Sequence, residues 1–168
     1  MNIILIGMPA SGKSTVGVIL AKLLGFDFID TDLLIQRREH QRLSEIISTR
    51  GLTAFLAAEE AACLSLKASH SVIATGGSVV YSEAAMAHLK SMGTVVCLAV
   101  DFEELEGRLH DIQRRGVALR PGQTLEELYV ERVLLYQKYA DITVEEGTGG
   151  LEETVKAVVE KFKTLGRI

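Results

Sequence analysis

The feature that most constrains the fold is the stretch Gly7-Met8-Pro9-Ala10-Ser11-Gly12-Lys13-Ser14, which fits the pattern G-x-x-x-x-G-K-[ST]. It follows a β-branched run, Asn2 to Gly7, and opens an amphipathic segment that stops at Gly25. Glycines let such a loop turn its backbone N–H groups inward, and the helix that follows directs its positive end at the same point. The sequence therefore predicts a phosphate-binding P-loop that joins the first strand to a helix.

The P-loop pattern also assigns individual roles. We expect Lys13 to reach the β- and γ-phosphates of a nucleotide and the Ser14 hydroxyl to bind Mg²⁺. The expected nucleotide contacts in the loop are Ala10, Ser11, Gly12, Lys13, Ser14 and Thr15. GTPases, motor ATPases and small-molecule kinases share this loop. A guanine-reading N-K-x-D motif is absent from the sequence, and 168 residues with one such loop leave little room for a motor.

Short β-branched runs alternate with longer helical patterns along the chain. The runs expected to form strands cover residues 2–7, 27–29, 72–75, 94–100 and 142–145. The run from Val95 to Val100 is apolar on both faces, which is typical of a parallel sheet covered by helices on each side. The pattern predicts one α/β domain of three layers over residues 1–168.

Two connections are longer than a plain crossover requires. Residues 33–70 contain two helical patterns, around 33–49 and 53–68, broken at Gly51, and we expect them to form a substrate-binding lobe. Residues 111–123 combine glycine, proline and arginine with little apolar periodicity, which predicts a surface lid without a buried face. Helix starts with a capping box are expected at Asp101 and Thr124.

Composition narrows the class of protein further. Lys and Arg number 18 against 22 Asp and Glu, and this mildly acidic balance argues against a nucleic-acid or membrane binder. The N-terminus lacks the basic region of a signal peptide. Cys63 and Cys97 lie far apart in the sequence, so we expect reduced core thiols. We expect a cytoplasmic monomer whose partner is a small molecule.

Asp30-Thr31-Asp32 follows the second strand, at the sheet edge where ligands bind in open α/β folds. Two such carboxylates can share the work of phosphoryl transfer: one holds a Mg²⁺-bound water, and the other accepts the proton of the attacking hydroxyl. An aspartate that only caps the following helix is the alternative interpretation. Gly76-Gly77 after the third strand is either a simple turn or a place where substrate approaches the backbone closely.

Several segments together resemble the shikimate kinase family, in order and with similar spacing over nearly the whole chain. They are residues 7–15, Phe28-Ile29-Asp30-Thr31-Asp32, Val72-Ile73-Ala74-Thr75-Gly76-Gly77 and Arg132-Val133-Leu134-Leu135-Tyr136. The resemblance implies the fold of nucleoside-monophosphate kinases, with a five-stranded parallel sheet in the order 2-3-1-4-5, a substrate lobe and a lid. It also implies ATP-dependent phosphorylation of the 3-hydroxyl of shikimate, with ATP and Mg²⁺ as cofactors.

The same resemblance carries roles to individual positions. Lys13 and Ser14 match the phosphate lysine and the magnesium ligand, Asp30 matches the aspartate near a metal-bound water, and Asp32 matches the substrate-binding aspartate that acts as base.

On the acceptor side, Gly76 and Gly77 fall on the substrate-contacting turn, and Arg132 matches the arginine that grips the substrate carboxylate. Arg115 sits where the family has a lid arginine that stabilises the transferring phosphate, and Arg108 sits where an arginine flanks the adenine.

The chain departs from the family pattern in the acceptor half. The family has Phe-Arg where this chain has Phe55-Leu56, and the missing arginine pairs with the substrate carboxylate. Losing one such contact costs about 2–3 kcal/mol, or about two orders of magnitude in affinity. Ser78 replaces a third glycine. In the lid, residues 115–118 replace Arg-Pro-Leu-Leu, which leaves Arg114 and Arg120 as alternative phosphate contacts.

Three hypotheses follow for the function. The first is a shikimate kinase. The second is a kinase with the same chemistry and another acceptor, a polyol or sugar acid, and Leu56 favours it. The third is a nucleotide-binding regulator without catalysis; retention of Asp32 argues against it, because a pure binder does not need that carboxylate.

Overall fold

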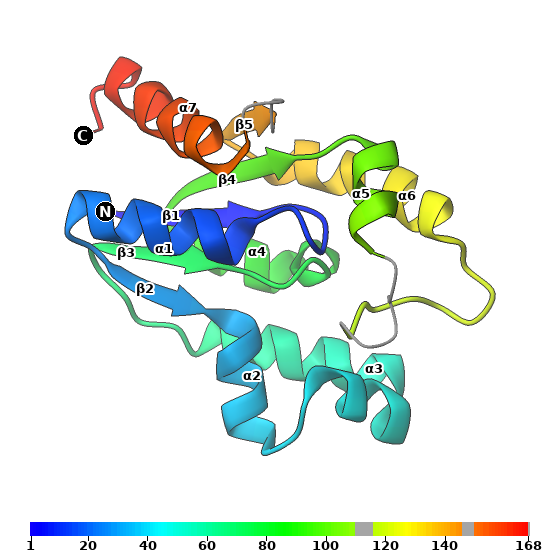
Figure 1. Ribbon diagram of the computed structural model, residues 1–168. Coiled ribbons are helices and arrows are strands. Elements are labelled where there is room, and N and C mark those ends of the chain that lie inside the picture. The colour runs from blue at the N-terminus through cyan, green and yellow to red at the C-terminus, as the bar shows by residue number, and fades with distance from the viewer. Residues whose placement is uncertain (110–115, 146–149, 168) are drawn as a thin grey trace.

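The fold is a parallel sheet between two layers of helices, as the computed structural model shows for residues 1–109, 116–145 and 150–167 (Figure 1). The sheet order is β2-β3-β1-β4-β5. The strands are β1 (Asn2–Ile6), β2 (Asp27–Asp30), β3 (Ser71–Ala74), β4 (Gly93–Ala99) and β5 (Ile142–Glu145). The helices are α1 (Lys13–Leu24), α2 (Thr31–Glu39), α3 (Leu43–Leu64), α4 (Glu83–Met92), α5 (Phe102–Arg108), α6 (Leu125–Tyr139) and α7 (Gly150–Thr164), with a short 3₁₀ helix, η1 (Val79–Tyr81). The expected fold class and strand order are confirmed.

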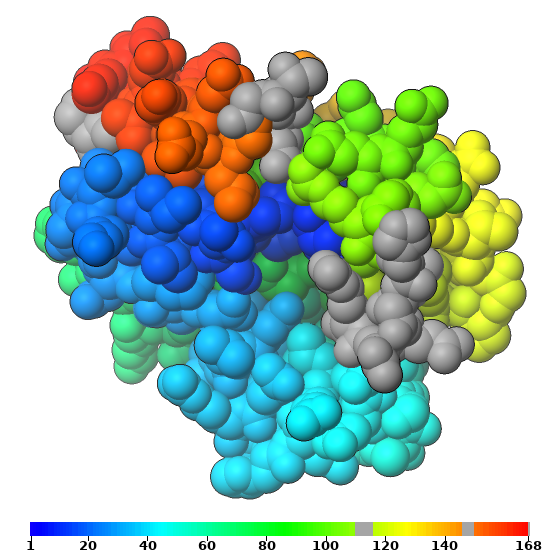
Figure 2. Space-filling model, in the orientation of Figure 1, coloured from blue at the N-terminus to red at the C-terminus, as the bar shows by residue number. Residues whose placement is uncertain are grey.

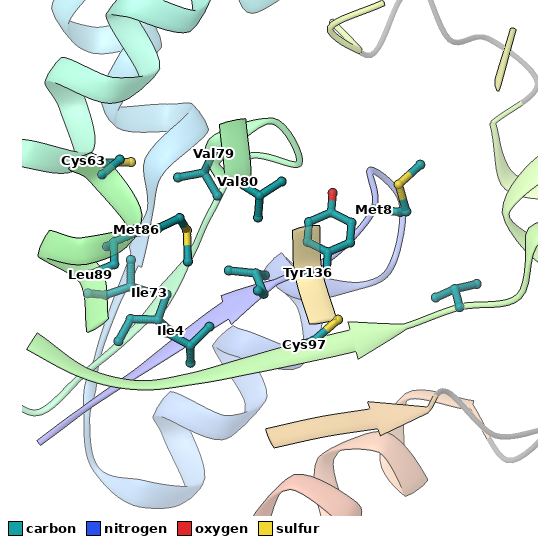
Figure 3. Packing of buried hydrophobic residues seen from close by; sticks show 14 of the residues in the cluster. Ile4, Met8, Cys63, Ile73, Val79, Val80, Met86, Leu89, Cys97 and Tyr136 are labelled. Carbon is teal, nitrogen blue, oxygen red and sulfur yellow. The ribbon is translucent and has the colours of Figure 1, made fainter. Parts of the chain in front are cut away.

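The period of two along β1 separates the core into two layers. Ile4 and Ile6 face one side of the sheet, where they pack with side chains of α4 and α6 such as Met86, Leu89 and Tyr136 (Figure 3). Ile3 and Leu5 face the other side and pack against residues of α1 and α7. In the space-filling view, α1 and α7 lie side by side over this second face (Figure 2). Both faces of β1 are therefore buried, as is typical of a strand in a parallel sheet covered by helices on each side.

Helices α2 and α3 project from the sheet as a separate layer with their own small core (Figure 1). Ile35 of α2 and Ile46, Phe55 and Ala62 of α3 form that core, and Ala118 packs against it. The expected break at Gly51 is confirmed as a kink, with φ 83° and ψ 168°. The expected continuous helical pattern over 33–49 is wrong, because α2 ends before His40, which adopts a left-handed φ of 53°.

The predicted lid at 111–123 lies partly outside the described residues, which resume at Gly116. The expectation of a loop without a buried face is wrong for Val117 and Ala118, because both are buried. A Cβ on Gly116 would lie 2.8 Å from Cβ of Leu43 at the start of α3. This part of the loop therefore packs closely against the α2–α3 layer.

Of the predicted capping boxes and free thiols, all but one capping box are confirmed. Thr124 and Glu127 form the expected capping box at α6, whereas Asp101 precedes α5 without a side-chain cap hydrogen bond, so that predicted box is wrong. Cys63 and Cys97 are buried free thiols, as expected. Over the three described ranges, no helix has both the length and the hydropathy that a membrane span requires.

Candidate active site

The P-loop leaves β1 in a conformation that requires glycine. Gly7 has φ 146°, and a Cβ there would lie 2.5 Å from the Leu98 carbonyl oxygen. Lys13 Nζ donates hydrogen bonds to the carbonyl oxygens of Gly7 (2.9 Å) and Met8 (2.6 Å) and to Ser11 Oγ (3.3 Å). Burial lowers the pKa of Lys13 to about 8, against the opposing pull of Asp32. The ammonium group is therefore held inside the loop that is expected to bind phosphate.

Ser14 is the second residue of α1 and lies beside the end of β2. Its hydroxyl donates a 2.7 Å hydrogen bond to Asp30 Oδ2. Asp30 Oδ1 accepts from the backbone N–H groups of Asp32 (2.9 Å) and Leu33 (3.3 Å), so Asp30 is the N-cap of α2. The capping role weighed from the sequence thus falls on Asp30, which also binds the P-loop serine.

Asp32, the second aspartate of the Asp30-Thr31-Asp32 segment, faces a cavity. Its side chain lines a cavity of about 470 Å³ that also contacts the P-loop residues Gly12 and Lys13. Burial raises the pKa of Asp32 to about 6; the neighbouring Asp30 adds to the rise, and the Lys13 charge opposes it. A carboxylate with this pKa is mostly ionised at neutral pH and is suited to accept a proton.

One cavity is lined both by the nucleotide contacts and by the acceptor contacts that the sequence predicts. Five of the expected nucleotide contacts line the cavity: Ala10, Gly12, Lys13, Ser14 and Thr15. The Ser11 side chain is bound to Lys13 instead. The expected acceptor contacts Asp32, Gly76, Gly77 and Arg132 line the same space. Residues that follow β1, β2 and β3 in the chain, together with Arg132 of α6, therefore meet in one site.

The glycine turn after β3 is sterically required. A Cβ on Gly76 would lie 2.1 Å from Glu59 Oε1 and 2.9 Å from Asp32 Oδ1. A Cβ on Gly77 would lie 2.8 Å from Pro9 Cδ and 3.1 Å from Arg132 Nη1. Side chains from four elements thus converge on this turn, and its backbone forms part of the cavity wall.

Arg132 is fully buried, although it is the acceptor-side cation expected to bind a carboxylate. Its Nη2 donates to the Ala118 carbonyl oxygen (2.8 Å) and its Nε to the Tyr81 hydroxyl (3.3 Å), whose ring lies 5.2 Å from the guanidinium carbon. These contacts fix the guanidinium group and leave its Nη1 edge beside Gly77.

The remaining arginines are placed differently. Arg108 Nη1 donates to the Ala10 carbonyl oxygen (3.2 Å), and its guanidinium forms an ion pair with Glu104, so this side chain lies against the P-loop. Arg120 forms an ion pair with Glu131 and is not among the cavity-lining residues in the described part of the chain. Arg114 and Arg115, expected as phosphate contacts, lie outside the described residues.

The sequence reasoning missed Glu59 as a cavity residue. This buried carboxyl group lines the cavity, whereas Leu56 lies on a smaller neighbouring cavity of about 230 Å³. Phe55 also faces the main cavity, and Glu59 follows it by four residues on the same helix. That i, i+4 spacing places both side chains on one face and was the available signal.

A P-loop and a buried carboxylate that share one cavity on a 2-3-1-4-5 sheet define a P-loop kinase, an enzyme that transfers a phosphoryl group from ATP to a hydroxyl group. The family model described as shikimate kinase matches residues 9–163. The chain belongs to the shikimate kinase family.

Individual relatives agree with this assignment. The chain is 38% identical to a shikimate kinase of Clostridium botulinum, over 96% of either chain. Among solved structures, it is similar to the shikimate kinase from Acinetobacter baumannii in complex with shikimate, with TM-score 0.85, 30% identity and coverage of 97% of this chain and 93% of that one. It is also similar to the shikimate kinase from Aquifex aeolicus, with TM-score 0.78, 33% identity and coverage of 99% of both chains.

Proposed function

We propose that this protein phosphorylates the 3-hydroxyl of shikimate with ATP, giving shikimate 3-phosphate and ADP. The observation that carries the proposal is the shared cavity, in which Asp32 faces the same space as Lys13 of the P-loop. The similarity to a kinase whose structure contains shikimate supports this choice of acceptor.

In this proposal the P-loop residues from Ala10 to Thr15 bind the nucleotide, and Lys13 stabilises the charge on the transferring phosphoryl group. Asp32 accepts the proton of the attacking hydroxyl as the bond from that oxygen to phosphorus forms and the bond to the leaving ADP breaks. Arg108 flanks the adenine, and Arg115 contacts the transferring phosphate. The position of Arg108 against the Ala10 carbonyl supports a nucleotide-side role for this residue.

The acceptor is held in the same cavity, beside the P-loop. Arg132, fixed by Tyr81 and Ala118, presents its Nη1 edge to the substrate carboxylate, and the backbone of Gly76 and Gly77 contacts the substrate ring. A guanidinium group that is already ordered loses little entropy on binding. One arginine, rather than two, then holds the carboxylate in this chain.

The residues around Ser14 fit a magnesium ion. Mg²⁺ prefers hard oxygen ligands and is held by one or two protein groups together with substrate phosphates and water. The Ser14 hydroxyl and the Asp30 carboxylate, already 2.7 Å apart, provide such a donor set beside the P-loop. Ser14 would bind the ion directly and Asp30 through water. When bound, the ion neutralises charge on the phosphates.

We further propose that residues 33–70 form the substrate-binding lobe and residues 111–123 the lid, within one kinase domain. The separate core of α2 and α3 supports the lobe, and the packing of Gly116 against Leu43 supports a lid that meets it. A cytoplasmic monomer without nucleic-acid or membrane partners completes the proposal.

The test is ATP consumption with a panel of hydroxylated acids, measured as ADP release. Saturable turnover with shikimate supports the proposal. Turnover only with another polyol or sugar acid supports the second candidate, which Leu56 favours because no arginine stands at that position. Nucleotide binding without turnover of any acceptor overturns both. Loss of Mg²⁺-dependent activity in Ser14→Ala, with wild-type folding, tests the metal site.

A further inference from the structure

Tyr81, the last residue of η1, contacts two neighbouring residues of α6. Its hydroxyl accepts a 3.3 Å hydrogen bond from Arg132 Nε, and its ring centre lies 5.2 Å from the guanidinium carbon. The same hydroxyl interacts with the Glu131 carboxylate, and this hydrogen bonding lowers the pKa of Glu131. Burial and the nearby Glu131 raise the pKa of Tyr81, so the hydroxyl keeps its proton and can donate it at neutral pH. Tyr81 therefore bridges an acidic and a basic residue.

Glu131 in turn holds the chain turn that precedes α6. Its carboxylate forms an ion pair with Arg120 and accepts a 3.3 Å hydrogen bond from Gln123 Nε2. The Arg120 N–H donates to Gln123 Oε1 (3.2 Å), and the Gln123 N–H donates to the Arg120 carbonyl oxygen (3.0 Å), so the turn is closed on itself. The charge of Glu131 is therefore matched by Arg120, and the turn is fastened to α6 through Glu131.

Arg132 contacts the same segment of the chain directly. Its Nη2 donates a 2.8 Å hydrogen bond to the Ala118 carbonyl oxygen. With Nε bound to Tyr81, two parts of the planar guanidinium group are occupied, and its Nη1 lies 3.1 Å from the position that a Cβ on Gly77 would take. A planar group held at two points has a fixed orientation, so these contacts direct the remaining edge toward the glycine turn.

The partners of Arg132 are neutral groups. In the part of the chain that the structure describes, no carboxylate forms an ion pair with it. A carbonyl oxygen and a phenol satisfy its N–H groups without neutralising its charge, so the charge remains available to an anionic group of the acceptor. Because Arg132 is fully buried, loss of either partner would leave an N–H group unsatisfied.

Tyr81 also lies near the position at which this chain lacks an arginine. Tyr81 and Leu56 line the same smaller cavity, and over the described ranges neither is among the residues that line the main cavity. Leu56 offers no charge to an acceptor carboxylate, so the orientation of Arg132 determines a larger share of the affinity. Tyr81 can act on the acceptor only through Arg132.

We infer that Tyr81 is a positioning residue for acceptor binding, whose hydroxyl orients Arg132 and connects it to Glu131 and to the turn at residues 120–123. The inference rests on the proposed function, in which Arg132 binds the acceptor carboxylate. It adds to that function a set of side chains behind the cavity wall, Tyr81, Glu131 and Arg120, on which the affinity for the acceptor depends.

The test compares shikimate with its methyl ester, which lacks the carboxylate charge, in wild type and Tyr81→Phe. Removing the hydroxyl should raise the KM for shikimate about tenfold, with kcat and the KM for ATP within about twofold of wild type. The ester should lower wild-type kcat/KM by about 10- to 150-fold, and this penalty should be at least threefold smaller in Tyr81→Phe. Tyr139→Phe is the matched control, because Tyr139 ends α6 and is not among the described residues that line the main cavity.

Glu131→Gln provides a second variant that leaves the phenol in place. It should raise the KM for shikimate severalfold and add little to Tyr81→Phe in the double variant, because both act through the same hydrogen bonds. If Tyr81→Phe does not fold, the ester comparison in Glu131→Gln decides.

An unchanged KM for shikimate in Tyr81→Phe overturns the inference, and so does an equal ester penalty in wild type and variant or a loss confined to kcat. Wild-type turnover of shikimate tests the proposed function separately. If the wild type phosphorylates another acid instead, the same comparison is made with that acid and its methyl ester.

Discussion

Replacing Asp32 with asparagine should lower turnover and raise the stability of the fold, so that the two effects of this carboxyl group can be measured separately. The amide keeps the shape of the carboxyl group but cannot take a proton from a hydroxyl. General bases contribute about 10²- to 10⁴-fold to rate, so we expect turnover to fall by at least the lower value. The phosphate-binding end of the cavity is built by the P-loop. We therefore expect ATP affinity to change little.

The same substitution should stabilise the fold at neutral pH. Burial raises the pKa of Asp32 from 3.8 to about 6. Between these values the folded chain retains a proton that the unfolded chain has released, so the contribution of this group to stability decreases as the pH rises and levels off above pH 6. At 1.36 kcal/mol for each pKa unit, the full loss is about 3 kcal/mol, and solvent screening at this partly exposed residue reduces it to about 2 kcal/mol.

The assay is urea unfolding of wild type and Asp32→Asn at pH 4 and pH 8, with ADP release and nucleotide titration on the same samples. We expect the variant to gain about 2 kcal/mol at pH 8 and almost nothing at pH 4. Asp27→Asn, at the exposed start of β2, is the matched control and should show neither effect. A gain of equal size at both pH values would refute the electrostatic reasoning. Parallel losses of turnover and ATP affinity would refute the assigned role.

Three further predictions test the remaining parts of the site. The pH profile of kcat/KM should be bell-shaped, rising through about pH 6 as Asp32 loses its proton and falling above about pH 8 as Lys13 loses its own; a flat profile between pH 5 and 6 contradicts the base assignment. Gly76→Ala should raise the KM for the acceptor at least tenfold in steady-state assays, because the new Cβ displaces two carboxyl groups, whereas Gly107→Ala, with open space around it, should have no effect. Leu56→Arg should lower the KM for shikimate by about tenfold through a charge-assisted hydrogen bond; an unchanged KM contradicts our interpretation of that position.

Much of the fold follows from local sequence patterns. The P-loop, the apolar runs of the strands and the break at Gly51 depend on residues close together in the chain, and backbone preferences act at that range. The helix boundaries could be predicted less exactly. The apolar pattern predicts one helix through His40, but α2 ends before this residue, whose backbone is left-handed. A left-handed backbone conformation does not change the spacing of apolar residues, so the pattern could not show it.

The lid and the pair of aspartates show where local patterns fail. Val117 and Ala118 are buried, although their segment shows no apolar periodicity, because the packing partner of Ala118 is the distant α2–α3 core. The sequence allowed Asp30 and Asp32 to exchange roles. Only the position of Ser14 and of the α2 backbone shows that Asp30 caps the helix and that Asp32 faces the cavity.

The sequence by itself predicted a nucleotide-binding P-loop at the edge of a parallel sheet and a pair of aspartates at the end of the second strand. The tertiary structure alone decided which side chains meet at the glycine turn after β3. Glu59 and Ser78 are nineteen residues apart, and Gly76 admits no side chain because both Glu59 and Asp32 approach it. Hydrogen bonding and steric exclusion act through space, so a pattern read along the chain does not contain them.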